Sequence, residues 1–371
     1  MTNLSEVSKA KNIVIKIGSS LLMNGNRFNS TWLKNFIDDI LYLKSKRKNL
    51  VIVASGAVSL GRKYLNIKKE KISINTKQAC AACGQVILMK NFMRHFEARK
   101  IKVAQILLTF SDTEDRRKSL NSRETIKTLL ELKIIPIINE NDSVATDELK
   151  FGDNDRLAAR VAQVIGSDLL ILLSDVEGLY DKNPKKNKEA KLIQKVTNIN
   201  SKIFKMSSSE TNDFGSGGMF TKIQAAEIAS TFGCKTIIMK GNTNSPISTF
   251  EKHKKGTIFT NVAKKKDSFK NWLGGSINIS GSVHIDDGAI KALNDGASLL
   301  PSGIKKISGN FSKGDIIEIL NSKGKKLGRG ISYYDSKELN LIKGKKSIYI
   351  RETLGYEGRD EIIHRDYLFL K

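Results

Sequence analysis

The chain has 371 residues, of which 40% are hydrophobic and 27% charged, a composition that argues against a disordered or fibrous protein. Its 63 lysines and arginines exceed its 38 aspartates and glutamates, so the formal net charge is +25. Three cysteines are too few for a disulfide framework, the N-terminal segment lacks the apolar stretch of a secretory signal, and no apolar run approaches the ~20 residues of a membrane helix. We therefore expect a soluble, cytoplasmic protein of two or three domains that does not associate with membranes.

The basic excess is compatible with nucleic acid, an anionic membrane surface or a phosphorylated substrate as partner. The lysine runs at 44–48, 68–71, 185–188 and 264–266 lie between periodic segments, however, and only 7% of the residues are aromatic. A lysine-rich surface spread over the whole chain accounts for the charge equally well. Charge alone therefore does not predict RNA binding.

The first 260 residues alternate short apolar segments with amphipathic ones. The pattern predicts strands at 11–17, 50–54, 103–108, 134–138, 169–173 and 236–239. One helix is expected to begin at Asn29 or Ser30, whose side chains can cap its first turn, and another to span 218–232 and stop at Gly233. This alternation predicts an α/β fold, in which helices cover both faces of an open, mainly parallel sheet.

The pattern changes after about residue 258. Residues 261–270 are polar and basic, and from residue 274 onward the predicted strands are short and separated by glycine-containing turns. We predict an α/β domain over residues 1–260, a linker over 261–276 and a small β-rich domain over 277–371.

The first candidate functional residue is Lys16, which interrupts a run of isoleucine and valine two residues before Gly18-Ser19-Ser20. A lysine inside a buried strand is unfavourable unless it meets an anion, which makes Lys16 a candidate phosphate contact. The alternative is an edge strand whose lysine points to water.

Further polar clusters follow the predicted strands or begin the predicted helices. Ligands of open parallel sheets bind at this edge, where backbone N–H groups of turns and helix N-termini can hold anions. Taken singly, each cluster is equally typical of an ordinary turn, loop or helix cap. The last of them has a glycine loop before a helix but lacks the spacing of a Walker A motif. The clusters are Ser55-Gly56-Ala57, Asn139–Asp142, Gly152–Asp155, Ser174-Asp175 and Ser216–Lys222.

Metal binding and a serine nucleophile are not predicted. Cys80 and Cys83 lie in a helical stretch of small residues, the only other cysteine is Cys234, and no histidine is spaced to complete a zinc site. The four histidines lie outside all of the polar clusters, and no G-x-S-x-G sequence is present.

Taken together and in this order, six motifs over residues 11–260 resemble the amino acid kinase family: KIGSS, SGAVSLG, INENDSVAT, FGDND, LLSDVEGLYDKNP and GSGGMFTK. The C-terminal part, ISGSVHIDDGAIKAL…GASLLPSGIKKISGNFSKGD, resembles a PUA domain. The NEND and GDND pair, together with this tail, favours the family members that phosphorylate glutamate over those that act on aspartate, acetylglutamate, carbamate or UMP.

The resemblance implies ATP-dependent phosphorylation of the γ-carboxylate of L-glutamate to glutamyl 5-phosphate, the first step of proline biosynthesis. A carboxylate with a pKa near ~4.3 is already ionised at neutral pH, so the reaction needs positioning and positive charge rather than a general base. Mg²⁺ is expected to bridge the ATP phosphates, which supply most of its oxygen ligands.

The resemblance also assigns roles to residues. Lys16, Lys222 and Asp155 would be catalytic, with Asp155 holding both lysines and Asp153 as the fallback for that role. Substrate contacts would fall on Ser55, Gly56, Asn139, Asp142 and Asn154. ATP contacts would be made by Lys16, Gly18, Ser19, Ser174, Asp175, Ser216, Gly217, Gly218, Met219, Phe220, Thr221 and Lys222.

Three positions depart from the pattern expected of the family. Ser19 and Ser216 stand where threonine is common and keep the hydroxyl. Phe220 is bulkier than the small residue expected in the glycine loop.

The resemblance implies partners as well. These are proline as feedback inhibitor, further copies of the chain in a dimer or tetramer, and the reductase that consumes glutamyl phosphate. Two alternatives stay open: an RNA-binding protein acting through the PUA-like domain, and a related kinase with another carboxylate acceptor. Any RNA binding is expected to be weak and salt-sensitive.

Overall fold

The computed structural model describes residues 6–24, 27–69, 72–145, 154–184, 186–207, 218–260 and 279–370. The chain divides into two compact units, Met1–Lys265 and Lys266–Lys371. The predicted linker over 261–276 lies outside the described residues. No helix in the described ranges combines the length and the apolar character needed to cross a bilayer.

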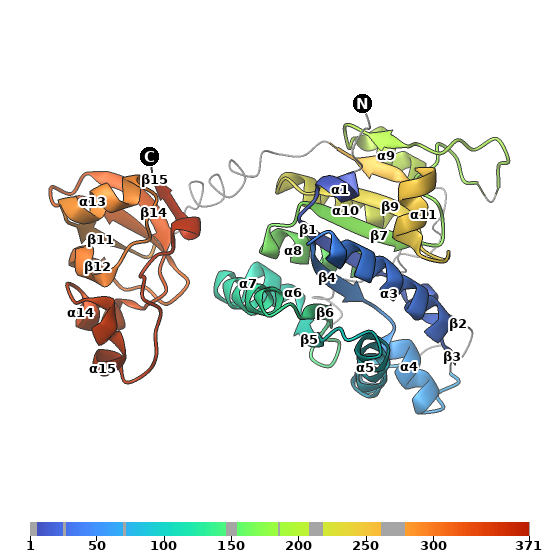
Figure 1. Cartoon of the computed structure of the whole chain (residues 1–371), viewed down its shortest axis with the longest axis horizontal. Coiled ribbons are helices and arrows are strands. Elements are labelled where there is room, and N and C mark those ends of the chain that lie inside the picture. Colours follow the sequence, from blue (N-terminus) through green and yellow to red (C-terminus); the bar gives the residue numbers. More distant parts are fainter. Residues whose placement is uncertain are drawn as a thin grey trace. The chain divides into compact units, whose positions relative to one another are not determined.

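The first unit is built on an eight-stranded sheet with the order β5-β6-β4-β1-β7-β9-β10-β8 (Figure 1). The strands from β5 to β9 in this order are parallel, whereas β10 runs antiparallel to β9. The mainly parallel α/β sheet is therefore confirmed. The strands are β1 (Asn12–Ile17), β4 (Asn49–Ala54), β5 (Val103–Leu108), β6 (Ile135–Glu140), β7 (Leu169–Ser174), β8 (Lys195–Val196), β9 (Lys235–Lys240) and β10 (Thr257–Phe259), with a separate hairpin of β2 (Met23–Asn24) and β3 (Arg27–Phe28).

Helices cover both faces of this sheet, as predicted. The helices are α1 (Glu6–Lys9), α2 (Ser19–Leu22), α3 (Ser30–Ser45), α4 (Ala57–Tyr64), α5 (Ile74–Glu97), α6 (Phe110–Glu114), α7 (Arg116–Glu131), α8 (Asn154–Ile165), α9 (Ser201–Ser207), α10 (Met219–Thr231) and α11 (Pro246–His253). One core cluster joins the sheet to α3, α5 and α11, and a second joins it to α8 and α10.

Strand β1 shows how alternation sets the direction of a side chain. Ile13, Ile15 and Ile17 belong to the core on the α3–α5 face, whereas Val14 belongs to the core on the α8–α10 face. Because strand side chains alternate with a period of two, Lys16 is on the same face as Val14. The lysine therefore points toward α8 and α10.

The predicted helix ends are confirmed. The Asn29 side chain accepts a hydrogen bond from the backbone N–H of Trp32 and caps α3. Gly233 follows α10 with φ +77°, a left-handed conformation that glycine adopts without steric cost.

Two glycines allow α4 and α5 to cross in close contact. A Cβ atom at Gly61 would lie 1.7 Å from the carbonyl oxygen of Cys80, and one at Gly84 would lie 1.7 Å from that of Ala57. The small residues around Cys80 and Cys83 thus belong to a helix crossing, and this crossing positions the N-terminus of α4.

The second unit has its own five-stranded sheet, with the order β12-β11-β13-β14-β15, and its own core. Its strands are β11 (Gly281–Ile285), β12 (Ile304–Gly309), β13 (Ile316–Leu320), β14 (Lys326–Ile331) and β15 (Leu368–Leu370). The helices are α13 (Asp287–Asn294), α14 (Ser336–Ile342) and α15 (Ile350–Leu354), with short 3₁₀ turns at Pro301–Gly303, Ser347–Tyr349 and Arg365–Tyr367. A small β-rich unit was predicted for this part of the chain, and its fold class is confirmed.

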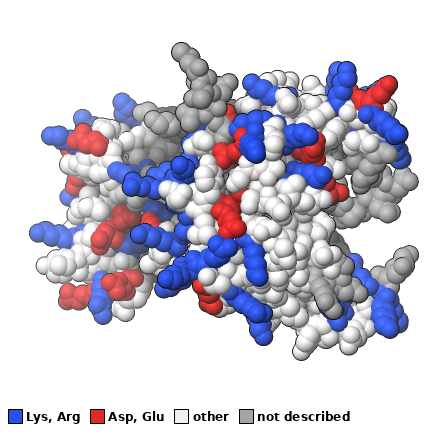
Figure 2. All heavy atoms as spheres, turned by 45° about the vertical axis from the view of Figure 1, so that its right-hand side comes forward, with Lys and Arg blue, Asp and Glu red and all other residues white. Residues whose placement is uncertain are grey.

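The surface charge is distributed. Figure 2 shows lysine and arginine side chains spread over the visible face, with aspartate and glutamate among them.

Candidate active site

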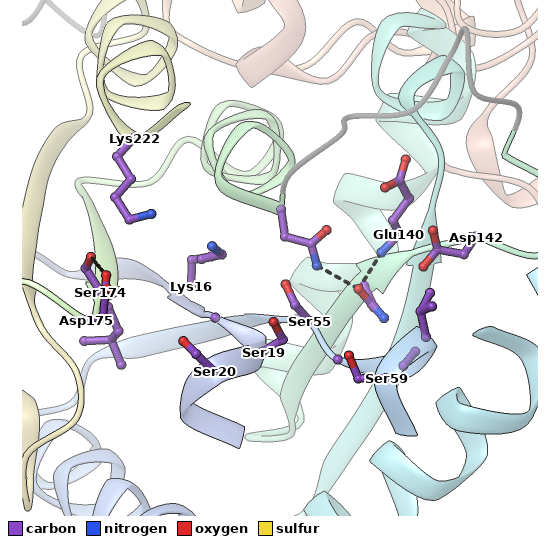
Figure 3. A pocket seen from close by; sticks show the side chains of 17 residues that line it. Lys16, Ser19, Ser20, Ser55, Ser59, Glu140, Asp142, Ser174, Asp175 and Lys222 are labelled. Carbon is purple, nitrogen blue, oxygen red and sulfur yellow. Dashed lines mark hydrogen bonds between the residues drawn. The ribbon is translucent and has the colours of Figure 1, made fainter. Parts of the chain in front are cut away.

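A cavity of about 430 Å³ lies in the first unit, at the edge of the sheet where β1, β4, β6 and β7 end. Figure 3 shows it from close by. Its lining comes from segments that are far apart in the chain, as expected for the carboxyl edge of a parallel sheet. The lining residues are Lys16, Gly18, Ser19, Ser20, Ser55, Gly56, Ala57, Val58, Ser59, Asn139, Glu140, Asp142, Asn154, Leu173, Ser174, Asp175 and Lys222.

Two buried lysines meet on one buried aspartate beside the cavity. Lys16 Nζ lies 2.6 Å from one carboxylate oxygen of Asp155, and Lys222 Nζ lies 3.0 Å from the other. Lys16 comes from β1, Asp155 from the first turn of α8 and Lys222 from the first turn of α10. The side chains are at most 7% exposed, so one carboxylate holds two ammonium groups with little screening by water.

The alternative of an edge-strand lysine is excluded for Lys16. Strand β1 lies between β4 and β7, and Lys16 pairs with Val53 on one side and Leu172 on the other. The residue is 5% exposed. Three formal charges remain after burial, two positive and one negative, so the cluster favours an anion at its open side.

Three helices at the cavity begin after a glycine and therefore have no side-chain N-cap from that residue. Helices α2, α4 and α10 begin after Gly18, Gly56 and Gly218, and none of these glycines provides a side-chain cap. Backbone N–H groups at such termini bind phosphate or carboxylate oxygens. Elsewhere in the unit, α3, α5, α6 and α7 are capped by the side chains of Asn29, Ser73, Thr109 and Asp115.

Gly56 has a backbone requirement of its own. Its φ of +110° lies in the region that residues with a Cβ atom avoid. The turn after β4 therefore needs glycine at this position in order to aim the first residues of α4 at the cavity.

A chain of side-chain amides organises the opposite wall. Asn154 Nδ2 donates to the Ala54 carbonyl (2.7 Å) and to Asn139 Oδ1 (2.8 Å), and Asn139 Nδ2 donates to Gln85 Oε1 (2.8 Å). All three side chains are buried. Since the amide hydrogens of Asn154 are both used, its carbonyl oxygen is the group it can offer to a ligand.

The cavity has a cationic side and an acidic side. Figure 3 shows Lys16 and Lys222 on one side, together with Asp175, and Glu140 and Asp142 on the other, with Ser19 and Ser55 between the two sides. A ligand that carries negative charge at one end and an ammonium group at the other matches this arrangement.

Ser174 and Asp175 lie at the end of β7, where Ser174 Oγ donates to Asp175 Oδ1 at 3.2 Å. Beyond them is a narrow crevice lined by residues Val176, Gly178, Leu179, Tyr180, Lys182, Asn183, Pro184, Met206 and Met219. Its volume is about 10 Å³, which is room for about one water molecule.

Most of the predicted site residues line the main cavity. Three predicted ATP contacts in the first turn of α10, however, have other surroundings. Met219 lines the narrow crevice. The single hydroxyl hydrogen of Thr221 has two acceptors within reach, the Asp155 carboxylate (3.1 Å) and the Gly218 carbonyl (2.9 Å), so the hydroxyl lies at the buried ion cluster. Phe220 packs on Phe204 of α9, with ring centroids 5.5 Å apart, and is absent from both linings. Ser216, Gly217 and the fallback Asp153 lie outside the described residues.

Several lining or supporting residues were not assigned from the sequence. Ser20, Ser59 and Glu140 lie inside the motifs KIGSS, SGAVSLG and INENDSVAT, whereas Gln85 lies in none of the six motifs. Glu140 had one available signal, because it lies inside the Asn139–Asp142 cluster. Gln85 had none, because its role depends on a hydrogen bond to a residue 54 positions away.

Within the part of the chain that the structure describes, no three His, Cys, Asp or Glu side chains gather to hold a metal ion. Asp155 is already engaged by two lysines.

Comparison with known proteins shows which families the two parts of the chain resemble. The model of the amino acid kinase family matches residues 11–240, and that of the PUA domain matches residues 281–354. A glutamate 5-kinase of Pelagibacter ubique is 47% identical over 358 residues, which cover 96% of this chain and 97% of that protein. A glutamate 5-kinase of Rhizobium leguminosarum bv. trifolii is 42% identical, with 99% and 94% covered. This chain belongs to the amino acid kinase family.

Proposed function

We propose that the chain transfers the γ-phosphoryl group of ATP to the γ-carboxylate of L-glutamate. The product is glutamyl 5-phosphate, and the reaction is the first step of proline biosynthesis. The observation that carries the proposal is the cavity with two lysines on Asp155 at one side and two carboxylates at the other. The names of the relatives, which cover nearly the whole chain, support glutamate as the acceptor.

Glutamate has charges that complement the acidic side of the cavity. Its ammonium group would lie near Asp142 and Glu140, and its α-carboxylate near Ser55 and the first N–H groups of α4. The γ-carboxylate would then extend toward Lys16. Asn154 would offer its carbonyl oxygen to the ammonium group.

ATP would occupy the remaining space. Its phosphates would lie between Lys16 and Lys222, near the N-termini of α2 and α10, with Mg²⁺ bound to phosphate oxygens. Its adenine would lie beyond Asp175, on the side of Tyr180 and Met219, where the crevice of about 10 Å³ would have to widen to admit a ring.

The chemical step requires no proton transfer. A γ-carboxylate oxygen of glutamate forms a bond to the γ-phosphorus, and the bond from that phosphorus to the β,γ-bridging oxygen breaks, so that ADP leaves. Negative charge accumulates on the transferred group and on the bridging oxygen, where Lys16 and Lys222 would stabilise it. Asp155 would act as a positioning residue, since both of its oxygens hold the lysines in place.

The test is a hydroxamate assay with ATP, Mg²⁺ and hydroxylamine, offering glutamate, aspartate or N-acetylglutamate separately. Hydroxylamine displaces phosphate from an acyl phosphate and leaves a hydroxamate, which gives a coloured complex when Fe³⁺ is added after the reaction. We expect colour with glutamate alone, and its loss in Lys16→Ala and Lys222→Ala. Colour with another acceptor instead would keep the mechanism and overturn the substrate. No colour with any acceptor would overturn the kinase assignment.

The remaining partners belong to the same proposal. We expect proline to compete with glutamate, because its ammonium and carboxylate groups match those of the amino acid substrate. We also expect a cytoplasmic dimer or tetramer, and transfer of the labile acyl phosphate to the glutamyl phosphate reductase.

RNA binding by the second unit is the second candidate. Ile348 and Tyr349 are 80% and 51% exposed, and Lys345 and Lys346 lie beside them in the chain. An exposed aromatic ring next to lysines can stack on a base and attract phosphates. We expect weak binding that falls steeply with salt, and sequence-selective binding in physiological salt would favour RNA as the main ligand.

A further inference from the structure

A second cavity of about 450 Å³ lies at the opposite edge of the same sheet, where β4 and β6 begin. The C-terminal ends of α3 and α7 form its sides. The lining residues are Lys44, Arg47, Lys48, Asn49, Leu50, Leu130, Glu131, Lys133, Ile134 and Ile135. Four of them are basic and one is acidic, so the cavity has a formal charge of +3.

The four cations of this cavity, Lys44, Arg47, Lys48 and Lys133, are not neutralised by the described part of the chain. None of them has a carboxylate oxygen of a described residue within 4.0 Å, the limit for an ion pair, even though Glu131 shares the lining. By contrast, Arg99 and Lys235 in the same unit form ion pairs of 3.0 and 2.7 Å.

Two of the four cations donate to backbone carbonyls. Lys48 Nζ donates to that of Ser8 at 2.5 Å. Lys44 is held from the other side of the lining. Its Nζ donates to the backbone carbonyl of Lys133 at 3.1 Å, which brings the two lysines together across the cavity. Burial and the positive charge of Lys133 lower the pKa of Lys44. A bound anion would remove this repulsion, because it would place negative charge between the two ammonium groups.

The backbone carries two of these basic side chains at positions where glycine is usual. Arg47 and Lys133 follow α3 and α7 with φ of +56° and +61°, in the left-handed region. The corresponding residues that follow α8 and α10 are Gly166 and Gly233. Lys100, Asn66 and Lys254, which follow α5, α4 and α11, are also left-handed, but they lie outside the cavity lining.

We propose that this cavity binds a small phosphate-bearing molecule, whose phosphates contact Lys44, Arg47 and Lys133. The volume is within the range of about 300–1,000 Å³ usual for small-molecule sites. Leu50, Leu130 and Ile135 provide an apolar floor for the rest of the molecule. Cations at the rim and an apolar floor together match a phosphate ester with an organic body.

Two strands of the sheet run from this cavity to the catalytic cavity. Strands β4 and β6 begin at the basic cavity and end at Ser55-Gly56 and Asn139-Glu140, which line the catalytic one. Each strand has six residues and spans about 20 Å at ~3.3 Å per residue. We expect occupancy to change the KM for glutamate more than the turnover, a consequence that rests on the proposed function.

The test uses hydrogen exchange of the full chain with pyrophosphate as the probe, without Mg²⁺ and in 150 mM NaCl (about physiological ionic strength). Pyrophosphate is expected to slow exchange in peptides covering residues 43–50 and 129–135. The double variant Arg47→Gly/Lys133→Gly should weaken this protection at least about tenfold, since it removes two of four cations. Glycine suits both backbone conformations, so the variant should stay folded.

The matched control is Lys100→Gly, which removes one lysine from the same kind of left-handed position outside the cavity. It should bind pyrophosphate like the unaltered chain. Equal protection by citrate would overturn the preference for phosphate, and an absence of protection at both peptides would overturn the site. Protection at residues 16–22 and 55–62 reports the catalytic cavity separately, so failure of the proposed function is distinguishable from failure of this site.

Discussion

At the scale of residues, the decisive feature is that two lysines share one carboxylate. One of them lies on β1 and the other in the first turn of α10. Asp155 is fully buried and contacts both Lys16 and Lys222. Ion clusters of this kind add little net stability but are strongly destabilised by removing one partner. Their value lies in holding the two ammonium groups at a defined separation.

We expect Asp155→Asn, which keeps the shape and removes the charge, to lower the turnover by about 100-fold or more, because both lysines lose their anchor. The same change should lower the free energy of unfolding by about 3 kcal/mol, because two buried ammonium groups are left to repel each other. Hydroxamate formation and urea denaturation measure the two effects. The exposed Asp295→Asn is the control, and equal turnover in both variants would contradict the role of Asp155.

Gln85 provides a second residue-scale prediction. Its Oε1 accepts from Asn139, which in turn holds Asn154. Gln85→Leu leaves a buried amide hydrogen of Asn139 without a partner, so we expect the KM for glutamate to rise about tenfold while the KM for ATP changes little. Steady-state kinetics with each substrate varied in turn measures the KM for glutamate and the KM for ATP separately.

Asn91→Leu on the same helix is the matched control for Gln85, because the Asn91 amide donates only to the helix carbonyl of Ile87. A Gln85→Leu variant that raised both KM values equally, or neither, would show that the amide chain does not position the glutamate site.

At the scale of elements, the crossing of α4 and α5 places the start of α4 at the catalytic cavity. Alanine normally stabilises a helix by about 1 kcal/mol over glycine. At Gly84 alanine should instead destabilise the protein, because the added Cβ would lie 1.7 Å from the carbonyl oxygen of Ala57. The backbone of α4 would have to move, and Ala57, Val58 and Ser59 with it.

We therefore expect Gly84→Ala to lower the free energy of unfolding by about 2 kcal/mol, as overpacking usually does, and to weaken glutamate binding. Chemical denaturation and the KM for glutamate are the measurements. Ala82→Ser, at an exposed position of α5, should change neither. A Gly84→Ala variant that is more stable than the unaltered chain would contradict the close crossing.

At the scale of the whole molecule, each unit has its own sheet and its own core. Every described lining residue of the catalytic cavity comes from the first unit. Domains of this size with a separate core usually fold by themselves. The second unit is therefore not expected to contribute to the chemical step.

We predict that a chain ending at residue 265 folds and keeps most of its hydroxamate-forming activity with glutamate. Circular dichroism and the hydroxamate assay check the fold and the activity. A folded but inactive fragment would show that the second unit contributes to catalysis.

The sequence by itself determined the α/β class, six of the eight strands of the main sheet and the polar motifs near their carboxyl ends, because period-two alternation, apolar runs and glycine turns are local signals. Strands β8 and β10, of two and three residues, were not predicted, because they are too short to show such a pattern. It also singled out Lys16, since a lysine within an apolar strand needs an anion. Only the tertiary structure decided that β1 lies between β4 and β7, which buries Lys16 and excludes an edge strand. The contact between Gln85 and Asn139, the crossing at Gly84 and the second basic cavity likewise depend on pairings between residues far apart in the chain. Such pairings arise from packing of whole elements, and no local pattern of residues specifies them.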